Sequence, residues 1–186
     1  MQKIWFTSDN HFGHKNILKF QAEAGTRLGQ DADEMNELMI KQWNSQVAFS
    51  DKVYCLGDFS FMNAERTEKV LQRLNGQIHL IRGNHDHWID DNTSKYFESI
   101  DDYKEITIEG KKVVMFHFPI FEWNRMHHGS YHLFGHVHGS QTIPGRAIDV
   151  GIDNRPQKDM GLWSWEELDK ILSKREIRMH HQKFDT

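Results

Sequence analysis

Side chains of the kinds that bind metal ions recur in five short clusters along this chain. The clusters are Asp9-Asn10-His11, Gly57-Asp58, Gly83-Asn84-His85-Asp86, His117 and Gly135-His136-Val137-His138. The chain has 13 histidines and a single cysteine, and imidazole is the commonest metal ligand in proteins. Carboxylate, imidazole and amide oxygen without thiolate suit Mn, Fe, Ni or Zn better than a structural zinc. The pattern therefore indicates metal chemistry.

Seven of these side chains are candidate ligands, which is too many for one tetrahedral ion. They are Asp9, His11, Asp58, Asn84, His117, His136 and His138. Seven ligands suffice for two divalent ions if one carboxylate bridges them, and we expect Asp58 to be that bridge. Two ions ~3.5–4 Å apart form the clamp used for phosphoryl displacement, with a shared hydroxide as nucleophile. We expect Mn²⁺, with Fe, Ni or Zn as alternatives, and an anionic phosphate ester as the substrate.

The elements that must position these side chains are strands. The hydrophobic runs that precede the clusters are Lys3–Ser8, Lys52–Leu56, Gln77–Arg82, Lys112–Phe116 and His132–Val137, the last of which includes its own cluster. Polar residues at the carboxyl ends of strands converge on one rim of a sheet. Residues two apart in an extended segment point the same way, so we expect Asp9 with His11, and His136 with His138, to chelate as pairs.

Helical patterns alternate with the first strands. Ala32–Val47 and Ala64–Leu74 carry apolar residues at helical spacing, and the order strand, helix, strand, helix, strand predicts a largely parallel sheet. Further along, Tyr103–Ile108 and Lys112–Phe116 flank Glu109-Gly110 as a predicted hairpin. Helices first and hairpins later favour an α/β (α+β) fold with two sheets packed together between helices.

The last third of the chain adds a strand and a helix. Ala147–Gly151 reads as a strand, and Ser164 to Glu167 form a capping box that opens a helix. The tail from Arg175 is expected either to pair as an edge strand or to stay loose. We expect His180 and His181 in this tail to have no catalytic role. From the length of the chain, we expect residues 1–186 to form a single domain.

Composition narrows the class of protein. Of 186 residues, 38% are hydrophobic and 27% charged, an ordinary globular mixture. No apolar run approaches the ~20 residues that cross a bilayer, and the apolar start reads as a strand, not a signal peptide. The lone Cys55 fits a reducing compartment, so we expect a cytoplasmic protein with no membrane partner. A net charge of −4 without a basic block disfavours long duplex nucleic acid as a ligand.

Each cluster alone has an ordinary explanation. An Asp-x-His pair arises by chance, Gly57-Asp58 can be a turn, and Gly-Asn-His-Asp can be a turn or part of an HD-type site. His117 alone would more often be a buried histidine with its hydrogen bonds satisfied, and Gly-His-Val-His could belong to a single-zinc protein. Five clusters in order, each at a strand end, are what indicates a metal site.

The series Asp-x-His, Gly-Asp, Gly-Asn-His-Asp, His and Gly-His-x-His resembles the calcineurin-like metallophosphoesterase superfamily. The runs Thr7 to Leu18, Gln42-Trp43-Asn44 and Asp149 to Asp153 are similar to the small stand-alone bacterial and phage members of that group. The resemblance implies a four-layer α-β-β-α sandwich, two mixed sheets flanked by helices.

The resemblance also implies residue roles. One metal would lie on Asp9, His11, Asp58 and His138, and the second on Asp58, Asn84, His117 and His136. Asp58 and His85 would be the catalytic residues. His85 would contact the phosphate without binding metal, and could protonate the leaving group, as imidazole is suited to do.

Differences from better-known branches of the family narrow the range of expected substrates. Asp58 is followed by Phe-Ser-Phe-Met, without the Asp-Arg-Gly of protein Ser/Thr phosphatases, and Asp86 replaces their glutamate. Phe61 stands where purple acid phosphatases have a tyrosine ligand. The Gly-Asn-His-Asp combination is similar to that of bacterial cyclic-nucleotide phosphodiesterases and nucleases, which slightly favours diesters.

Two further residues are candidate substrate contacts. His14 lies three positions after His11 and could reach the phosphate, or cap the start of a helix. Arg125 follows Trp123 in the polar loop Glu122–Gly129, which could stack a base and bind phosphate. A solvated surface loop is the favoured alternative. Asp149 and Asp153 are expected to support turns or hold imidazoles, while His79 and His87 are expected to be structural.

The sequence thus predicts a two-metal hydrolase acting on phosphate mono- or diesters, such as small nucleotides or short nucleic acids. The alternative from another class is a non-catalytic interaction scaffold on the same fold, which would not need His85. Other metallohydrolases fit poorly, because His138 is followed by Gly-Ser-Gln where a metallo-β-lactamase has Asp-His. An HD phosphohydrolase would need His85-Asp86 inside a helix.

Overall fold

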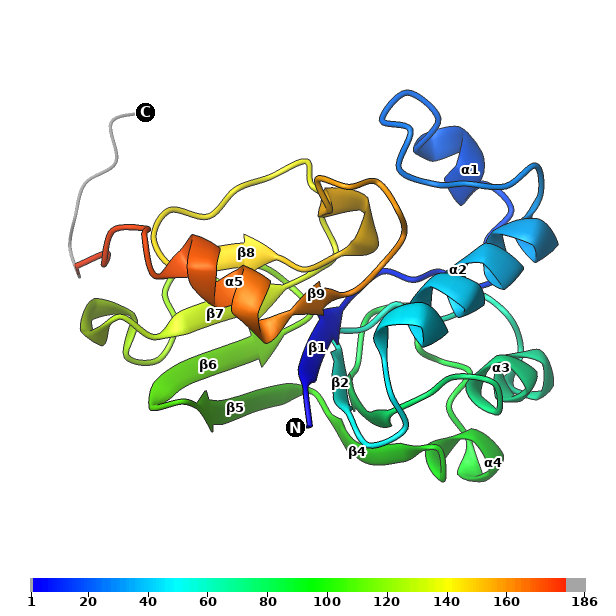
Figure 1. Cartoon of the computed structure of the whole chain (residues 1–186), viewed down its shortest axis with the longest axis horizontal. Helices are drawn as coiled ribbons and strands as arrows, with labels where there is room; N and C mark the ends of the chain where they lie inside the picture. Colours follow the sequence, from blue (N-terminus) through cyan, green and yellow to red (C-terminus); the bar gives the residue numbers. More distant parts are fainter. Residues whose placement is uncertain (1, 180–186) are drawn as a thin grey trace.

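Short parallel strands build the first sheet (Figure 1). The computed structural model describes residues 2–179. The sheet has the order β4-β3-β2-β1-β9, with β1 (Ile4–Thr7), β2 (Lys52–Cys55), β3 (Gln77–Ile81), β4 (Phe97–Asp101) and β9 (Trp163–Ser164). β1 to β4 are parallel, and β9 runs antiparallel to β1. Because parallel strands end at the same edge, the segments after β1, β2 and β3 meet there.

The second sheet begins with the predicted hairpin, which is confirmed. Its order is β5-β6-β7-β8, with β5 (Tyr103–Ile108), β6 (Lys111–Phe116), β7 (Tyr131–Phe134) and β8 (Ala147–Asp149). Glu109 and Gly110 have φ values of 49° and 79°, as a two-residue turn of type I′ requires. β6, β7 and β8 are parallel, so this sheet is also mixed.

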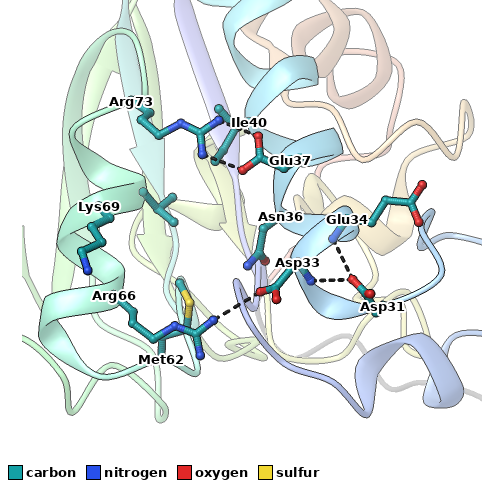
Figure 2. A pocket seen from close by; sticks show the side chains of 11 residues that line it. Asp31, Asp33, Glu34, Asn36, Glu37, Ile40, Met62, Arg66, Lys69 and Arg73 are labelled. Atoms are coloured by element: carbon teal, nitrogen blue, oxygen red, sulfur yellow. Dashed lines mark hydrogen bonds and ion pairs between the residues drawn. The ribbon is translucent and has the colours of Figure 1, made fainter.

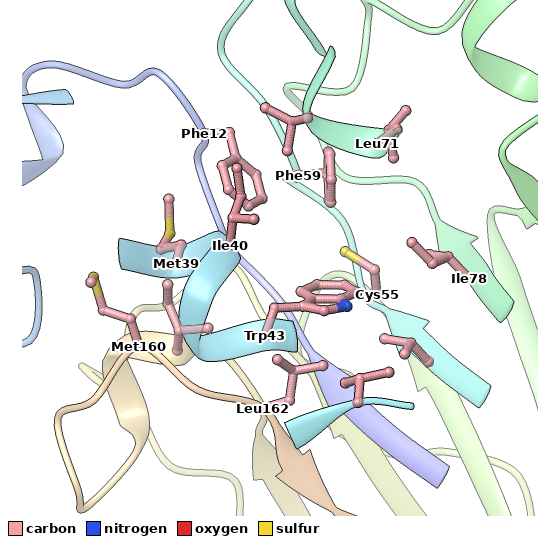
Figure 3. Packing of buried hydrophobic residues seen from close by; sticks show 14 of the residues in the cluster. Phe12, Met39, Ile40, Trp43, Cys55, Phe59, Leu71, Ile78, Met160 and Leu162 are labelled. Atoms are coloured by element: carbon pink, nitrogen blue, oxygen red, sulfur yellow. The ribbon is translucent and has the colours of Figure 1, made fainter. Parts of the chain in front are cut away.

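Helices cover the outer face of the first sheet. α2 (Ala32–Gln46) begins where the Asp31 carboxylate accepts the backbone N–H groups of Asp33 and Glu34, and α3 (Ala64–Leu71) follows β2. Figure 3 shows α2 placing Trp43 among residues of β2 and β3, and Trp43 is buried within this cluster. Burying a large apolar side chain stabilises the fold by about 2–3 kcal/mol, so this core holds the strand ends at fixed positions.

A second core fills the space between the two sheets. Phe6 and Leu56 point into it from the first sheet, and Met115 and Leu133 do so from the second. α5 (Trp165–Leu172) adds its apolar side to the same core. The capping box at Ser164 is confirmed, since Ser164 and Glu167 exchange side-chain and backbone hydrogen bonds.

The loop of residues 118–130 packs against the outer face of the second sheet. Trp123 and Met126 of this loop pack on Val114 and Phe134, and the loop contains the 3-10 turn η1 (Met126–His128). The predicted α/β class with two packed mixed sheets is confirmed.

The sequence did not predict several short elements. They are α1 (Ile17–Phe20), α4 (Asp91–Ser94), β4, β9 and the 3-10 turn η2 (Ile152–Asn154). The tail forms no strand over its described residues 175–179, and Arg178 donates to the Phe121 carbonyl at 2.5 Å. His180 and His181 lie outside the described residues. Within residues 2–179 we find no helix with the length and apolar character that a membrane span requires.

Candidate metal centre

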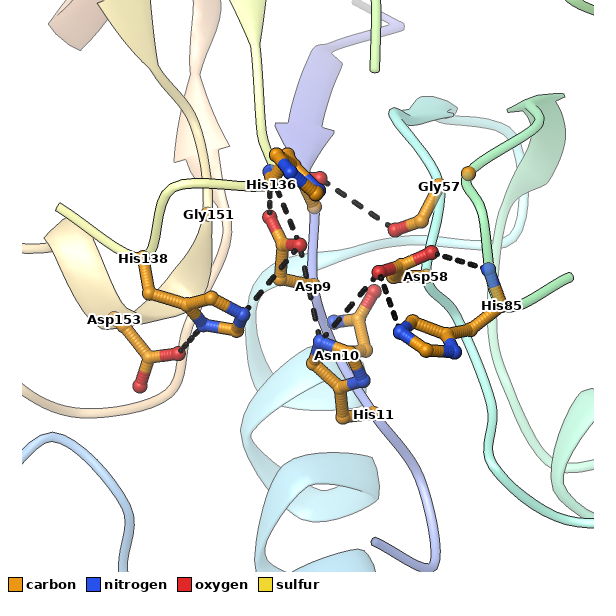
Figure 4. Close-up of polar contacts among 12 residues, drawn as sticks. Asp9, Asn10, His11, Gly57, Asp58, His85, His136, His138, Gly151 and Asp153 are labelled. Carbon is orange, nitrogen blue, oxygen red and sulfur yellow. Dashed lines mark hydrogen bonds and ion pairs between the residues drawn. The ribbon is translucent and has the colours of Figure 1, made fainter. Parts of the chain in front are cut away.

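The candidate ligands follow five strands and meet at one edge of the two sheets. Figure 4 shows five of them, Asp9, His11, Asp58, His136 and His138. Asp9 follows β1, Asp58 follows β2 and Asn84 follows β3. From the second sheet, His117 follows β6 and His136 follows β7. The backbone N–H of His136 donates to both carboxylate oxygens of Asp9, at 3.1 and 2.9 Å, which joins the end of β7 to the end of β1.

Donor atoms of six candidates form two groups, and within each group the atoms lie within 4.8 Å of one another. The groups are Asp9, His11 and His138, and Asp58, His117 and His136. In the first group, Asp9 Oδ1 lies 3.8 Å from His11 Nε2 and 3.9 Å from His138 Nε2. Each group offers one carboxylate and two imidazoles, a donor set that suits a divalent transition metal.

Asp58 lies between the two groups. Its Oδ2 is 3.6 Å from His117 Nε2 in its own group and 3.8 Å from His11 Nε2 in the other. The seventh candidate, Asn84, places Oδ1 3.1 Å from His117 Nε2. The Leu56 carbonyl lies 2.7 Å from His117 Nδ1, so the other ring nitrogen faces the donor groups.

Left-handed backbone conformations aim these side chains, which corrects one prediction. Asp9, His11, Asp58, His136 and His138 have φ values of 55°, 52°, 51°, 71° and 48°. The donor atoms of Asp9 and His11 lie in one group, as expected, although the backbone at both residues is left-handed and not extended. The expectation that His136 and His138 chelate as a pair is wrong: β7 ends at Phe134, and the turn that follows sends them into different groups. Left-handed non-glycine residues cost about 1–2 kcal/mol each and cluster at functional sites.

A pocket of about 190 Å³ opens beside both groups. His85 lies there with 44% of its side chain exposed, its Nε2 4.0 Å from Asp58 Oδ2. His14 also lines the pocket, and its ring stacks on Phe61 at a centroid distance of 3.9 Å. Helix α1 has Asn16 as its N-cap, with no side-chain capping bond. Of the two roles considered for His14, the structure therefore excludes the cap and leaves the pocket.

The sequence matches the family model of the calcineurin-like phosphoesterase superfamily domain over residues 3–145. The chain belongs to this superfamily. Protein MJ1445 of Methanocaldococcus jannaschii is 34% identical over 142 residues, which cover 75% of this chain and 72% of the relative. The gene 66 protein of Mycobacterium phage L5 is 28% identical, with 82% of this chain and 87% of the phage protein covered.

A solved structure supports the same fold. AQ665 from Aquifex aeolicus superimposes on this chain with a TM-score of 0.68 at 25% sequence identity. The match covers 92% of this chain and 100% of AQ665. The predicted likeness to the small bacterial and phage members of the calcineurin-like superfamily is confirmed by these relatives.

His11 shows why a metal ion fits this calcineurin-like site. Both ring nitrogens of His11 are buried and have no hydrogen-bond partner among the described residues. Burial, together with the nearby Arg27 and His138, lowers the pKa of His11 to about 2, so the ring is neutral and a lone pair is free to bind a metal. Burial raises the pKa of Asp58, but the hydrogen bond and charge of His117 outweigh it and lower that pKa to about 2. An ionised Asp58 carboxylate beside the neutral His11 ring offers donors that a divalent cation needs.

Asp86 joins the loop after β3 to the loop after β2. Its carboxylate accepts the backbone N–H groups of Asp58 and Phe59, each at 2.9 Å, and that of Gly83 at 2.8 Å. The Trp88 indole donates to it at 3.2 Å. Asp86 is thus not directed at the metal-ligand groups, and it fixes the backbone that carries Asp58.

Asp153 orients the imidazole of His138, which is one of the two roles predicted for this carboxylate. Asp153 Oδ2 lies 2.7 Å from His138 Nδ1, so Nε2 points at Asp9. The sequence did not reveal Arg27, a buried side chain that donates to both Asp153 oxygens at 2.8 and 2.7 Å and to the carbonyl of Asn10 at 2.8 Å. An isolated arginine in a loop carries no sequence signal of this role.

Asp149 supports turns, one of the two roles predicted for Asp149 and Asp153. It accepts the backbone N–H groups of Gly139 and Gly151, each at 2.7 Å. Burial and the charge of Asp9 raise its pKa to about 7. His79, expected to be structural, stacks on Tyr54 and bonds to Ser99 at 3.0 Å.

The structure does not bring Arg125 to the metal-ligand groups, so the role of substrate contact considered for it is wrong. Arg125 lines a different pocket with Gly110 and Lys112, at the end of β6 opposite His117. Trp123, only 5% exposed, cannot stack on a base. The physical reason is hydrophobic packing on the outer face of the second sheet. Trp123 and Met126 are buried there, so the loop lies away from the metal-ligand groups.

A larger cavity of about 530 Å³ lies between α2 and α3. Figure 2 shows its charged lining, with Arg66 paired to Asp33 at 3.2 Å and Arg73 to Glu37 at 2.6 Å. None of the candidate metal ligands lines it. Two of its basic side chains thus pair with acidic residues of the same lining, and it is not part of the candidate centre.

Proposed function

We propose that this chain hydrolyses phosphate mono- or diesters, with small nucleotides or short nucleic acids as substrates and two divalent cations as cofactors. The observation that carries the proposal is the position of Asp58 between the two groups of donors, within 3.6 and 3.8 Å of an imidazole from each. A pair of divalent ions polarises a phosphoryl oxygen and lowers the pKa of water enough to supply a nucleophile at neutral pH.

Each donor has a role in this proposal. Asp9, His11, Asp58 and His138 would hold one ion, and Asp58, Asn84, His117 and His136 the other. Mn²⁺ is the ion we would load first, with Fe, Ni and Zn as alternatives. Neutralisation of two buried carboxylates by two divalent ions leaves positive charge, which binds the anionic ester.

His85 is the proposed general acid. It lies beside Asp58 in the pocket and has no place in either donor group. The backbone N–H of His85 donates to Asp58 Oδ1 at 2.9 Å, which fixes the main chain from which the imidazole extends. An imidazole in this position can contact the phosphate and give a proton to the leaving oxygen.

The experiment uses protein stripped by a chelator and reloaded with Mn²⁺, Ni²⁺, Zn²⁺ or Mg²⁺, assayed on aryl phosphate mono- and diesters. We expect turnover of at least one ester class and two bound ions per chain. His85→Asn should lower kcat by about 10²–10⁴-fold, the usual contribution of a general acid, without changing the metal content. The matched control is His87→Asn, an exposed histidine two positions along the same loop.

Two results would count against this function. Protein carrying two ions that turns over neither ester class would exclude hydrolysis of this kind. The scaffold alternative gains if His85→Asn leaves the biological effect of the protein intact while a surface substitution abolishes it.

A further inference from the structure

Aromatic rings line one side of the pocket, from its rim to the metal-ligand groups. Phe20, on α1, meets the His14 ring with centroids 6.0 Å apart and planes at 70°. The His14 ring is nearly parallel to the Phe61 ring, and the centroids of the Phe61 and His85 rings are 4.3 Å apart. One face of the pocket is therefore a continuous series of rings that ends at the proposed general acid.

The outermost ring is open to a ligand. Phe20 is 69% exposed, whereas Ile17 in the same short helix is 3% exposed and belongs to the core. Phe20 therefore contributes little to the core of the fold. A flat apolar ring exposed at the mouth of a pocket is a surface on which another aromatic ring can stack.

His85 identifies which part of a substrate lies against these rings. This step rests on the proposed function, in which His85 gives its proton to the leaving oxygen. The leaving group must then lie on the His85 side of the phosphorus, where Phe61, His14 and Phe20 follow in order. A leaving group with an aromatic ring fits that side.

Gln21 favours a nucleobase over a tyrosine ring. Gln21 lines the same pocket as Phe20. Its Oε1 accepts a long hydrogen bond from Thr26 Oγ1 at 3.5 Å, so the amide keeps two N–H donors and one oxygen lone pair for the hydrogen-bonding edge of a base. The ring of a tyrosine leaving group presents no such edge.

We propose that Phe20 and Gln21 bind the base of a nucleoside leaving group. The oxygen of water forms the new bond to phosphorus, the bond from phosphorus to the nucleoside oxygen breaks, and that oxygen takes the proton from His85. The attacking water gives up its proton to solvent, and His85, which is partly exposed, regains a proton from solvent. The base must be unpaired to reach Phe20, so the substrates are nucleotides or single-stranded ends and not duplex interiors.

The test compares substrates that differ only in the base. One pair is a nucleoside 5′-monophosphate and ribose 5-phosphate, and the other is a dinucleotide and its analogue whose leaving nucleoside lacks the base. Stacking of one base on an aromatic side chain corresponds to about ten-fold or more in kcat/KM. We expect the metal-loaded protein to prefer the base-bearing member of at least one pair by that factor.

Variants of Phe20 link the preference to this ring. Phe20→Ala should lower kcat/KM for the base-bearing substrate about ten-fold and so reduce the preference for it, because the stacking contact is lost. Phe20→Trp should retain the preference. Phe49→Ala is the matched control, because Phe49 is also an exposed phenylalanine, at 82%, but lies in the loop between α2 and β2. A wild-type preference for phosphotyrosine over the nucleotide, or a preference unaltered by Phe20→Ala, overturns the proposal.

A binding measurement separates this inference from the proposed function. Saturation-transfer NMR with free adenosine and free ribose needs neither hydrolysis nor metal. We expect transfer to the base protons of adenosine in the wild type and in Phe49→Ala, and about ten-fold weaker binding in Phe20→Ala. Adenosine binding without hydrolysis of any ester would reject the proposed function alone, whereas hydrolysis without base-dependent binding would reject the role of Phe20 and Gln21.

Discussion

His138 depends on residues that are not themselves metal-ligand candidates. Its Nδ1 bonds to Asp153, and Asp153 in turn accepts two bonds from the buried Arg27. Burial alone raises the pKa of Asp153, but the hydrogen bond from His138 and the charge of Arg27 outweigh it and lower that pKa. The carboxylate therefore stays ionised and keeps Nε2 of His138 aimed at Asp9.

Asp153→Asn tests this arrangement at the scale of one residue. We expect the affinity of one metal site to fall about 10–100-fold, the usual effect of removing a partner of a ligating histidine, while the second site keeps its affinity. We also expect lower stability, because Arg27 keeps its charge without a counter-ion, and breaking a buried pair in this way costs up to about 3–5 kcal/mol. Competitive titration with a chelating dye measures the two affinities.

Asp159→Asn is the control for that experiment. It also removes a carboxylate from a buried arginine, Arg155, at 3.1 Å. Asp159 has no contact with His138, so metal affinity should not change. Equal loss of affinity in both variants would show that general destabilisation, and not the orientation of His138, explains the effect.

At the scale of elements, periodic runs were predictable and the turns between them were not. The strand of Lys52–Leu56 and the helix of Ala32–Val47 were found within one residue because each carries a full hydrophobic pattern. β9 has two residues and α1 has four, too few to show any period. Chain order and strand ends therefore predicted which residues meet, while the turns that aim them had no sequence signal.

Arg125 shows the same limit within a loop. Its polar neighbours suggested a substrate contact, but the buried Trp123 decides the path of the loop. A loop conformation depends on contacts with strands distant in sequence, here Val114 and Phe134. The metal-ligand candidates were easier to locate because each cluster lies at the carboxyl end of a predicted strand.

Gly135 tests how closely the turn after β7 approaches the end of β1. A Cβ at Gly135 would lie 1.9 Å from Ser8 Oγ and 2.5 Å from Asp9 Oδ2, so Gly135→Ala must displace Asp9 or the turn. We expect loss of at least one bound ion per chain by elemental analysis, with a lower free energy of unfolding.

Gly110→Ala is the matched control for this element. Gly110 has φ +79°, and no atom lies within 4 Å of the added Cβ. The substitution should therefore lower the free energy of unfolding only through backbone strain, by about 1 kcal/mol. Metal content should stay at the wild-type value. If Gly135→Ala also retains full metal content, the close approach does not constrain the site.

At the scale of the whole molecule, the candidate centre exists only when the two sheets are packed together. Asp9 and Asp58 come from the first sheet, and His117, His136 and His138 from loops of the second. The folded chain also holds five of the seven ligand candidates in left-handed conformations, namely Asp9, His11, Asp58, His136 and His138. Unfolding separates the donors, so ions that bind the native state stabilise it by mass action.

Urea unfolding at increasing Mn²⁺ concentration therefore counts the ions that the fold binds. One ion at a hundred times its Kd adds about 2.7 kcal/mol to the free energy of unfolding, and two ions about twice that. Above saturation, the free energy should rise with the logarithm of metal concentration at a slope of 2RT for two ions. His138→Ala, which removes a donor from one group, should reduce that slope toward RT, whereas His85→Asn should leave it at 2RT. A slope of RT in the wild type would mean that the two groups of donors share a single ion, and no dependence on Mn²⁺ would mean that neither group binds it.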